Sequence, residues 1–150
     1  MLKVRRAIEA DRLPVFKMCV LMHRETDFQH FELDPQKLLE GVGSWIHGHA
    51  LFVVEDGDQV VGMLAAAIRE TWFGPESFAS EELFYVTPEY RGTRAAFLLM
   101  KAYMSWAEEQ GIKHIRAGVA TGGAPGAERL YEHFGMHRMG GNFVAHLARS

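Results

Sequence analysis

The chain has 150 residues, 48% of them hydrophobic and 23% charged, so one globular domain over residues 1–150 can bury a full core without a metal or a disulfide. Its net charge of −3 argues against nucleic acid or an anionic membrane as a partner, and any anion site must be local. With Cys19 as the single cysteine, no intrachain disulfide can form, and we expect a cytoplasmic protein. No stretch resembles a signal peptide or the roughly 20 apolar residues of a membrane span.

The first half of the sequence predicts a strand, two helices and a β-hairpin. Apolar residues alternate within residues 2–8, as in a half-exposed strand, and helical spacing begins at Leu13. A second helix is expected to begin at Asp34–Pro35, because Asp34 can accept hydrogen bonds from free amides and proline suits the first helical position. Residues 51–68 contain two β-rich runs around Gly57, which predicts two antiparallel strands.

The middle of the sequence predicts a buried strand followed by a buried helix. The run ELFYV at residues 82–86 is nearly all apolar, which is typical of a strand covered on both faces. The helix is expected over residues 94–110, since its only clear polar stripe has helical spacing and Gly111 offers a stop. That stripe consists of Lys101, Ser105 and Glu108.

The last third predicts a strand at residues 112–119, a loop at 121–126 and a helix with an apolar stripe over residues 127–134. Residues 136–147 are expected to form two short strands about a Gly-Gly pair. The whole order of elements predicts an α/β (α+β) fold with a mixed sheet.

The loop between the buried strand and its helix reads RGTRAA at residues 91–96. A helix start exposes free amides at the positive end of the helix dipole, and such a terminus binds phosphate groups. Arg91 and Arg94 flank this start, and guanidinium groups match phosphate oxygens in pairs, which favours a diphosphate. The glycine patterns of the Rossmann and Walker loops are absent, which argues against a usual dinucleotide or nucleoside triphosphate. The alternative is an ordinary solvated loop.

The stretch Pro88–Ala96 resembles the acyl-CoA pyrophosphate loop of the GCN5-related N-acetyltransferases, whose pattern is Q/R-x-x-G-x-G/A. Arg91 fits the first position of this pattern and Ala96 the last, whereas Arg94 stands where the family has glycine. The order of predicted elements is similar over nearly the whole chain, and AERLYEHFGM at residues 127–136 resembles the family's late helix. The resemblance implies a mostly antiparallel central sheet flanked by about four helices.

The resemblance further implies acetyl-CoA as cosubstrate and direct attack by a primary amine of a small molecule or a protein. The backbone of Phe84, Tyr85 and Val86 is expected to pair with the pantetheine arm, as an added strand would. Homodimers are common in the family, so one is an option here. The residues expected to hold the pyrophosphate are Arg91, Gly92, Thr93, Arg94, Ala95 and Ala96.

Catalytic roles for three residues follow from the same resemblance. Tyr131 matches the late-helix tyrosine that often lies near the CoA sulfur, so it is the candidate general acid, with packing in the core as the alternative. Glu81 and Glu82 are the candidate bases, with a water chain or a merely solvated pair as alternatives. Strict alternation places Glu82 on the face of Phe84 and Val86, which favours Glu82, although a bulge would reverse this parity.

The acceptor pocket is expected to involve residues 23–31 and 71–78, which hold aromatic, acidic or histidine side chains. The His-x-His pair at residues 47–49 lacks a third ligand at a defined spacing, so no metal site is expected. Two other functions stay open. One is a non-catalytic CoA or phosphate-binding module with the same fold, and the other is an interaction protein that uses exposed Trp72 and Phe73.

Overall fold

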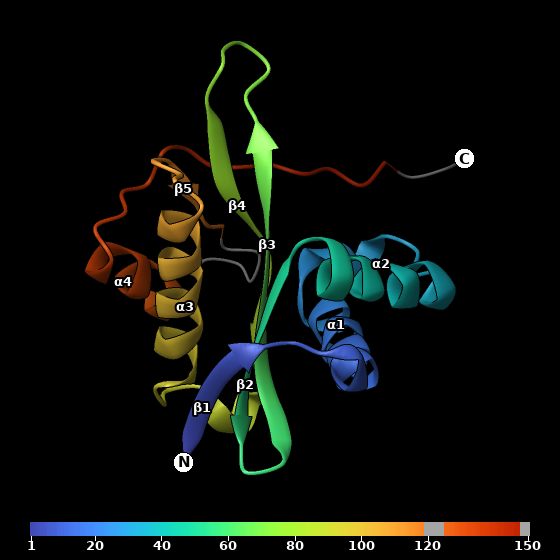
Figure 1. Ribbon diagram of the computed structural model, residues 1–150. Helices are drawn as coiled ribbons and strands as arrows, with labels where there is room; N and C mark the ends of the chain where they lie inside the picture. Colours follow the sequence, from blue (N-terminus) through green and yellow to red (C-terminus); the bar gives the residue numbers. More distant parts are fainter. Residues whose placement is uncertain (119–124, 148–150) are drawn as a thin grey trace.

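The fold is built around one five-stranded sheet (Figure 1). The computed structural model describes residues 1–118 and 125–147. The strands follow the order β1-β2-β3-β4-β5, and all neighbours are antiparallel except β4 and β5. The strands are β1 (Leu2–Arg6), β2 (Ala50–Asp56), β3 (Gln59–Glu70), β4 (Ser77–Val86) and β5 (Ile115–Arg116).

Helices cover both faces of this sheet. Two of them, α1 and α2, lie on one face, and α3 and α4 lie on the other (Figure 1). The predicted fold, a mixed and mostly antiparallel sheet with about four flanking helices, is therefore confirmed for the described residues. Within residues 1–118 and 125–147, no helix has the length and apolar character that crossing a bilayer requires. The helices are α1 (Arg12–Glu25), α2 (Pro35–Gly48), α3 (Ala95–Glu109) and α4 (Pro125–His133).

Two hydrophobic cores fill the space between the sheet and its helices. The core under α3 contains Leu64 and Leu99, and the core under α1 and α2 contains Val15 and Met63, all fully buried. Strand β3 contributes to both cores, because successive residues of a strand point to opposite faces. Its residues 61–67 are all buried, so β3 is the layer on which both cores depend.

At Gly62, helix α3 approaches the sheet closely. A Cβ atom there would lie 2.9 Å from Val54 Cγ1 and 3.2 Å from both Leu99 Cδ1 and the carbonyl oxygen of Tyr85, which is closer than packed atoms allow. Gly62 also pairs with Val86, the last residue of β4. The missing side chain therefore lets α3 pack next to the end of β4.

Several predicted local signals are confirmed. Helix α2 begins at Pro35, and Asp34 Oδ1 accepts hydrogen bonds from the amides of Gln36 and Lys37 at 3.1 and 3.2 Å. The β2–β3 turn contains Gly57 with a φ of +62°, a backbone conformation that glycine adopts without strain. The polar stripe of α3 is exposed, as its spacing predicts.

One prediction for the strands is confirmed and another differs. Strand β4 is covered on both faces, as its apolar composition predicts, because Leu83 and Tyr85 pack into the core under α1 and α2, whereas Phe84 and Val86 pack into the core under α3. The predicted strand at residues 112–119 is reduced to Ile115–Arg116 within the described chain, and Val119 lies outside it. Because β5 is so short, it leaves most of the outer edge of β4 uncovered.

Residues 136–147 form no strand in the part of the chain that the structure describes, so the prediction of two short strands is wrong. A strand needs a neighbouring backbone edge to pair with, and the two-residue β5 does not supply one. These residues instead leave α4 and pass the sheet toward the side of α1 and α2 (Figure 1). Most of the predicted loop at 121–126 lies outside the described residues.

Candidate functional site

The outer edge of β4 is open beyond its contact with β5. Pairing with β5 ends at Ser80, and residues 81–86 have no partner on this edge among the described residues. Unpaired backbone groups of this kind can bind an extended ligand as an added strand would. The predicted pantetheine residues Phe84, Tyr85 and Val86 lie in this stretch.

The loop before α3 leaves backbone amides free at the helix start. It leads from the short helix η3 (Pro88–Tyr90) to Gly92, whose φ of +86° favours glycine. The hydroxyl of Thr93 accepts a hydrogen bond from the amide of Ala95 at 3.3 Å. The amide of Ala96 finds no acceptor within the described chain. The helix start therefore has donors and a dipole that suit an anion.

Arg91 holds this loop against the end of α1. Its Nε donates to the carbonyl oxygen of Val86 at 2.9 Å, and its Nη2 donates to the Glu25 carboxylate at 2.8 Å. The guanidinium carbon lies 5.2 Å from the centroid of the Tyr85 ring, and the Tyr85 hydroxyl donates to Glu25 at 2.9 Å. The side chain of Arg91 is thus engaged by the protein itself.

Arg94 has different surroundings. Its side chain is exposed, and its guanidinium carbon lies 4.8 Å from the centroid of the Phe97 ring. No hydrogen bond or ion pair joins the Arg94 side chain to another described residue, and only its backbone carbonyl is bonded, to the amide of Leu98. Arg94 therefore keeps all its guanidinium donors available for a ligand, whereas Arg91 uses Nε and Nη2 within the protein.

A β-bulge in β4 separates the side chains of Glu81 and Glu82. Strand β3 pairs with Glu81 on one side of the bulge and with Leu83 on the other, so Glu82 is the extra residue. Glu81 therefore faces α3 and α4, together with Phe84 and Val86. Strict alternation predicted that Glu82 shares the face of Phe84 and Val86, and this prediction is wrong. The bulge places Glu81 on that face instead, which is the alternative expected for a bulged strand.

Glu82 is bound on the opposite face. Arg69 Nε donates to its Oε1 at 2.8 Å, and the Ser80 hydroxyl donates to its Oε2 at 3.5 Å. By alternation from Glu81, Ser80 points to the side of α1 and α2. The charge of Glu82 is thus compensated by an arginine, away from the face of Glu81.

Glu81 is half-buried, and its pKa is raised from 4.5 to about 8, chiefly by burial. The negative charge of Glu82 contributes to this rise, while the positive charge of Arg116 opposes it. A carboxyl group whose pKa lies near the working pH can exchange protons with a bound amine. Among the two glutamates, Glu81 is the one whose environment suits acid–base chemistry.

Tyr131 approaches the same face from α4. Its ring centroid lies 6.5 Å from that of Phe84, and its hydroxyl donates to the carbonyl oxygen of Gly118 at 2.6 Å. Burial raises the pKa of Tyr131, and the charge of Glu81 raises it further. The phenol therefore stays protonated at neutral pH, which is the state that a general acid requires.

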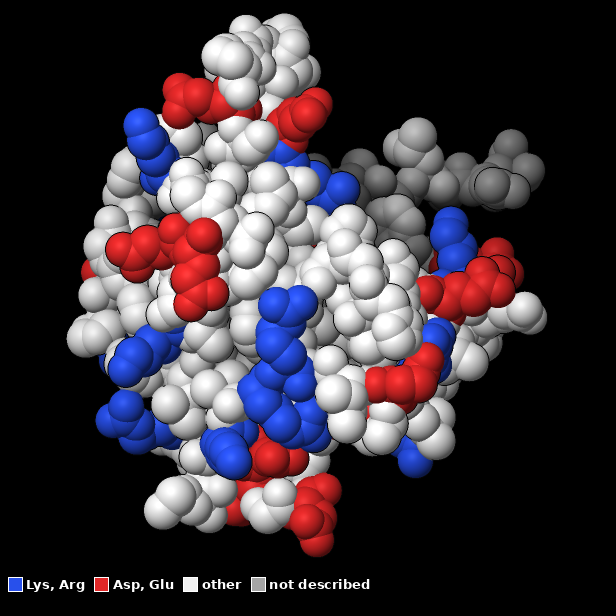
Figure 2. Space-filling view, in the orientation of Figure 1, with Lys and Arg blue, Asp and Glu red and all other residues white. Residues whose placement is uncertain are grey.

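Two loops are predicted to bind an acceptor. One contains the short helix η2 (Asp27–His30) after α1. The other forms the tip of the β3–β4 hairpin, which extends beyond the helices (Figure 1). At this tip Trp72 and Phe73 are 93% and 74% exposed, and their rings contact each other edge to face. Figure 2 shows acidic side chains next to this uncharged tip.

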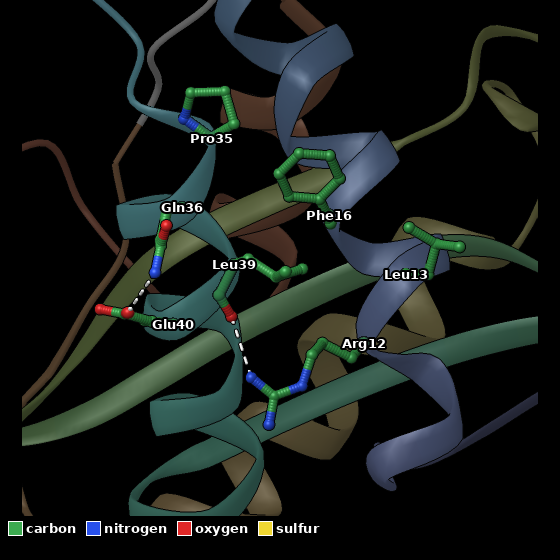
Figure 3. Close-up of a pocket in the computed structure, with 7 residues that line it drawn as sticks. All are labelled: Arg12, Leu13, Phe16, Pro35, Gln36, Leu39 and Glu40. Carbon is green, nitrogen blue, oxygen red and sulfur yellow. Dashed lines mark hydrogen bonds between the residues drawn. The ribbon is translucent and has the colours of Figure 1, made fainter.

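A shallow apolar groove between α1 and α2 contains none of the predicted site residues (Figure 3). The His-x-His pair at residues 47–49 also lies apart from them. His47 Nε2 is 3.1 Å from Glu9 Oε1, and within the described chain the pair joins no group of three metal-binding side chains. The groove is lined by Arg12, Leu13, Phe16, Pro35, Gln36, Leu39 and Glu40.

The sequence matches a known protein family over most of its length. The match to the acetyltransferase (GNAT) family covers residues 18–136. The chain belongs to the GNAT family. No curated protein sequence matches it at a significant level.

Solved structures share this GNAT fold at low sequence identity. A possible acetyltransferase from Clostridium difficile 630 superposes with a TM-score of 0.75 at 20% identity, covering 100% of this chain and 99% of that chain. AAC(6')-Iy in complex with the bisubstrate analog CoA-S-monomethyl-acetylneamine has a TM-score of 0.76 at 13% identity, with 100% of this chain and 99% of that chain covered. A predicted acetyltransferase from Clostridium acetobutylicum with acetyl-CoA has a TM-score of 0.73 at 14% identity, with 97% of this chain and 96% of that chain covered.

Sequence reasoning missed two residues that position groups of this GNAT site. Glu25 holds Arg91 and Tyr85, and Arg69 holds Glu82. Glu25 and Arg91 are separated by 66 positions, and no local pattern of residues signals such a contact.

Proposed function

We propose that this protein transfers the acetyl group of acetyl-CoA to a primary amine by direct attack. The observation that carries the proposal is the bulge at Glu82, because it places Glu81 on the same face as Tyr131, next to the open edge of β4. An acid and a base then lie at one end of this edge, and the amides of α3 lie at the other.

The open edge of β4 and the start of α3 together form the site proposed for acetyl-CoA. The pantetheine arm would pair with the backbone of Phe84, Tyr85 and Val86. The pyrophosphate would lie on the amides of Gly92 to Ala96, with the guanidinium of Arg94 on a phosphate oxygen. Arg91 would act as a positioning residue, since its side chain is bound to Glu25. Two GNAT-fold structures were solved with CoA-type ligands, which supports this choice of cosubstrate.

The reaction follows from the roles of two side chains. The carboxylate of Glu81 accepts a proton from the acceptor ammonium, and the free amine attacks the thioester carbon, forming the C–N bond. The tetrahedral intermediate, whose nitrogen is still protonated, then breaks its C–S bond. The hydroxyl of Tyr131 gives its proton to the departing thiolate, and the resulting phenolate takes the remaining extra proton from the nitrogen. The products are a neutral acetylated amine and CoA, with the first proton held by Glu81 until it is released to water.

A small cationic amine is the acceptor class that we propose, with a protein amine as the alternative. An exposed carboxylate stands in the candidate loop at the β3–β4 tip, at Glu76, and it would attract a positive acceptor. The likeness to AAC(6')-Iy, whose bound analog carries an acetylneamine group, supports a small amine.

Calorimetry with CoA tests the cosubstrate site. We expect the wild type to bind CoA and Arg94→Ala to bind it about tenfold more weakly, since hydrogen bonds to charged groups contribute roughly 1.5–3 kcal/mol. Lys101→Ala, on the exposed stripe of the same helix, is the matched control and should bind normally. No binding by the wild type would leave the interaction protein as the remaining hypothesis.

Thiol release from acetyl-CoA across a panel of amines then separates an enzyme from a non-catalytic CoA-binding module. Two observations favour the module as second candidate: Arg94 replaces the glycine of the family pattern, and the Tyr131 hydroxyl is engaged by Gly118. Binding of CoA without amine-dependent thiol release would support the module and contradict acetyl transfer.

A further inference from the structure

The segment of residues 141–147 reaches the side of α1 and is joined there through one side chain. His146 Nε2 lies 2.9 Å from Asp27 Oδ2, and within the described chain no other hydrogen bond joins this segment to the rest of the molecule. His146 is 35% exposed, whereas Phe143 and Leu147 are almost fully exposed. Whatever holds this segment in place therefore acts mainly at His146.

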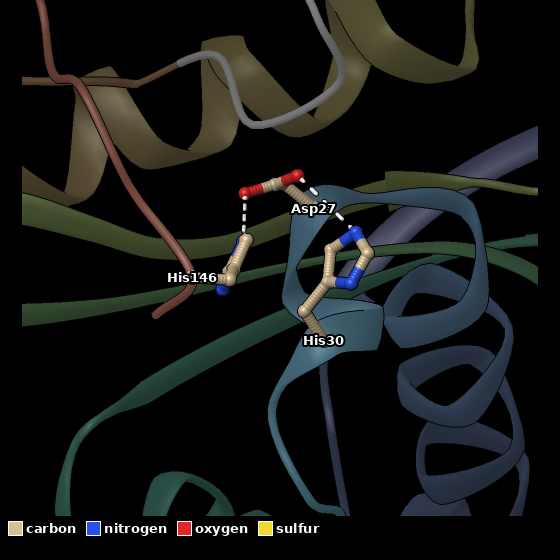
Figure 4. A group of neighbouring side chains, drawn as sticks. All are labelled: Asp27, His30 and His146. Atoms are coloured by element: carbon tan, nitrogen blue, oxygen red, sulfur yellow. Dashed lines mark hydrogen bonds and ion pairs between the residues drawn. The ribbon is translucent and has the colours of Figure 1, made fainter. Parts of the chain in front are cut away.

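The partner of His146, Asp27, belongs to the short 3-10 helix η2. Residues three apart in a 3-10 helix lie one above the other, so Asp27 and His30 of η2 share one side. The buried Thr26 caps η2 by accepting a hydrogen bond from the amide of Phe28 at 3.3 Å. One oxygen of the Asp27 carboxylate faces His146 and the other faces His30 (Figure 4).

The three side chains have the spacing of metal ligands. Their ligand atoms all lie within 4.8 Å of one another. Asp27 Oδ2 is 2.9 Å from His146 Nε2, and the other oxygen of the same carboxylate, Oδ1, is 3.8 Å from His30 Nε2. Ligands at about 2.0–2.1 Å from a tetrahedral zinc ion are about 3.3 Å apart, so both histidines lie within about half an ångström of that spacing from an oxygen of Asp27. Small rotations of exposed side chains would complete the geometry.

The two imidazole rings of the cluster lie close together, with the ring centroids of His30 and His146 4.3 Å apart. One metal ion can bind two neutral imidazoles and a carboxylate at the same time. Elsewhere in the described chain, His114–Glu76 and His47–Glu9 join one histidine to one carboxylate.

We propose that Asp27, His30 and His146 bind a zinc ion that fastens residues 141–147 to the loop after α1. Two nitrogen ligands and one oxygen ligand suit zinc, and water would fill the fourth position. The ligands are 119 positions apart in sequence at their widest, which is why their spacing along the chain gives no metal motif. This site is independent of acetyl transfer.

Titration of the untagged, EDTA-treated protein with zinc chloride at pH 7.5, followed by calorimetry, tests the site. We expect one zinc per chain for the wild type and an affinity lower by roughly tenfold or more for Asp27→Asn, His30→Ala and His146→Ala. His114→Ala removes an exposed histidine of a simple ion pair and should bind like the wild type. No binding by the wild type, or unchanged binding by the three variants, would overturn the proposal.

Hydrogen exchange measured by mass spectrometry tests the fastening. Zinc should slow exchange of the amides in residues 141–147 in the wild type and in His114→Ala, but not in His146→Ala. Circular dichroism shows whether each variant is folded, and the ligands are exposed, so we expect all of them to fold. Zinc binding that leaves the exchange of this segment unchanged would contradict its attachment.

Discussion

Tyr103 and Tyr131 hold two carbonyl groups of the same short stretch of chain: Tyr103 donates to Arg116 and Tyr131 to Gly118, each at 2.6 Å. Tyr103 is fully buried in α3, whereas Tyr131 is only half-buried, in α4. The two residues thus make the same kind of hydrogen bond, and the charge of Glu81 helps to raise the pKa of both. They differ in exposure, since only Tyr131 has surface that a ligand can reach.

This pair allows a controlled test of the general acid. Tyr131→Phe should lower kcat on the order of 100-fold, because the departing thiolate loses its proton donor. Tyr103→Phe loses an equivalent hydrogen bond and should keep its kcat, although it should unfold more easily, by about 1 kcal/mol. Steady-state thiol release measures both. An equal loss of kcat in the two variants would point to a structural role for Tyr131.

Glu81 and Glu82 offer a second matched pair. In the wild type, kcat/KM should rise with pH toward a plateau above about 8, since Glu81 must be ionised to accept a proton. Glu81→Gln should lower kcat/KM on the order of 100-fold and lose this dependence, apart from the titration of the amine itself. Glu82→Gln should keep the profile, because its carboxylate is bound to Arg69. A profile lost with Glu82→Gln instead would make Glu82 the base.

The pKa of Glu81 also predicts how stability depends on pH. Between about 4.5 and about 8 the unfolded chain releases a proton that the folded protein keeps, so the free energy of unfolding falls as pH rises through this range. Glu81→Gln lacks this ionisation, so its free energy of unfolding should not show this fall. Relative to the wild type, it should be more stable at pH 8 than at pH 5 by at least ~1 kcal/mol. Urea unfolding at both pH values measures the difference. Parallel changes in the two proteins would show that Glu81 ionises normally.

The positive φ of Gly92 predicts a local effect on the cosubstrate. Gly92→Ala strains the loop before α3 by about 1 kcal/mol, and should weaken CoA binding because the amides move. Gly111→Ala is the control: its φ is +74°, it lies at the other end of α3, and a Cβ atom added at either glycine would meet no atom within 4 Å. Both variants should lose similar stability in thermal unfolding, and only Gly92→Ala should bind CoA more weakly in calorimetry. Equal CoA affinities would argue against a phosphate site at this loop.

Local signals in the sequence predicted most of the fold. Asp34–Pro35 marks the start of α2 through hydrogen bonds that need no distant partner, and the glycine-containing loop RGTRAA precedes the start of α3. The bulge at Glu82 could not be located, because the run EELFYV contains no glycine or other residue that marks an inserted position. Its presence decides which glutamate faces Tyr131.

Contacts between distant residues explain the other differences. Glu25 reaches Arg91 across 66 positions and His146 reaches Asp27 across 119, so neither contact leaves a pattern in the neighbouring sequence. The end of the chain has the composition of strands, but strands form only against a free backbone edge. Whether residues 136–147 form strands therefore depends on the length of β5, and the sequence of residues 136–147 carries no information about that length.

The uncovered edge of β4 makes the protein a template for the backbone of another chain. Exposed edges of this kind promote association between molecules unless something caps them. If the pantetheine arm lies along residues 81–86, the cosubstrate also acts as a solubilising cap. Light scattering during storage should then show slower aggregation with CoA than without it.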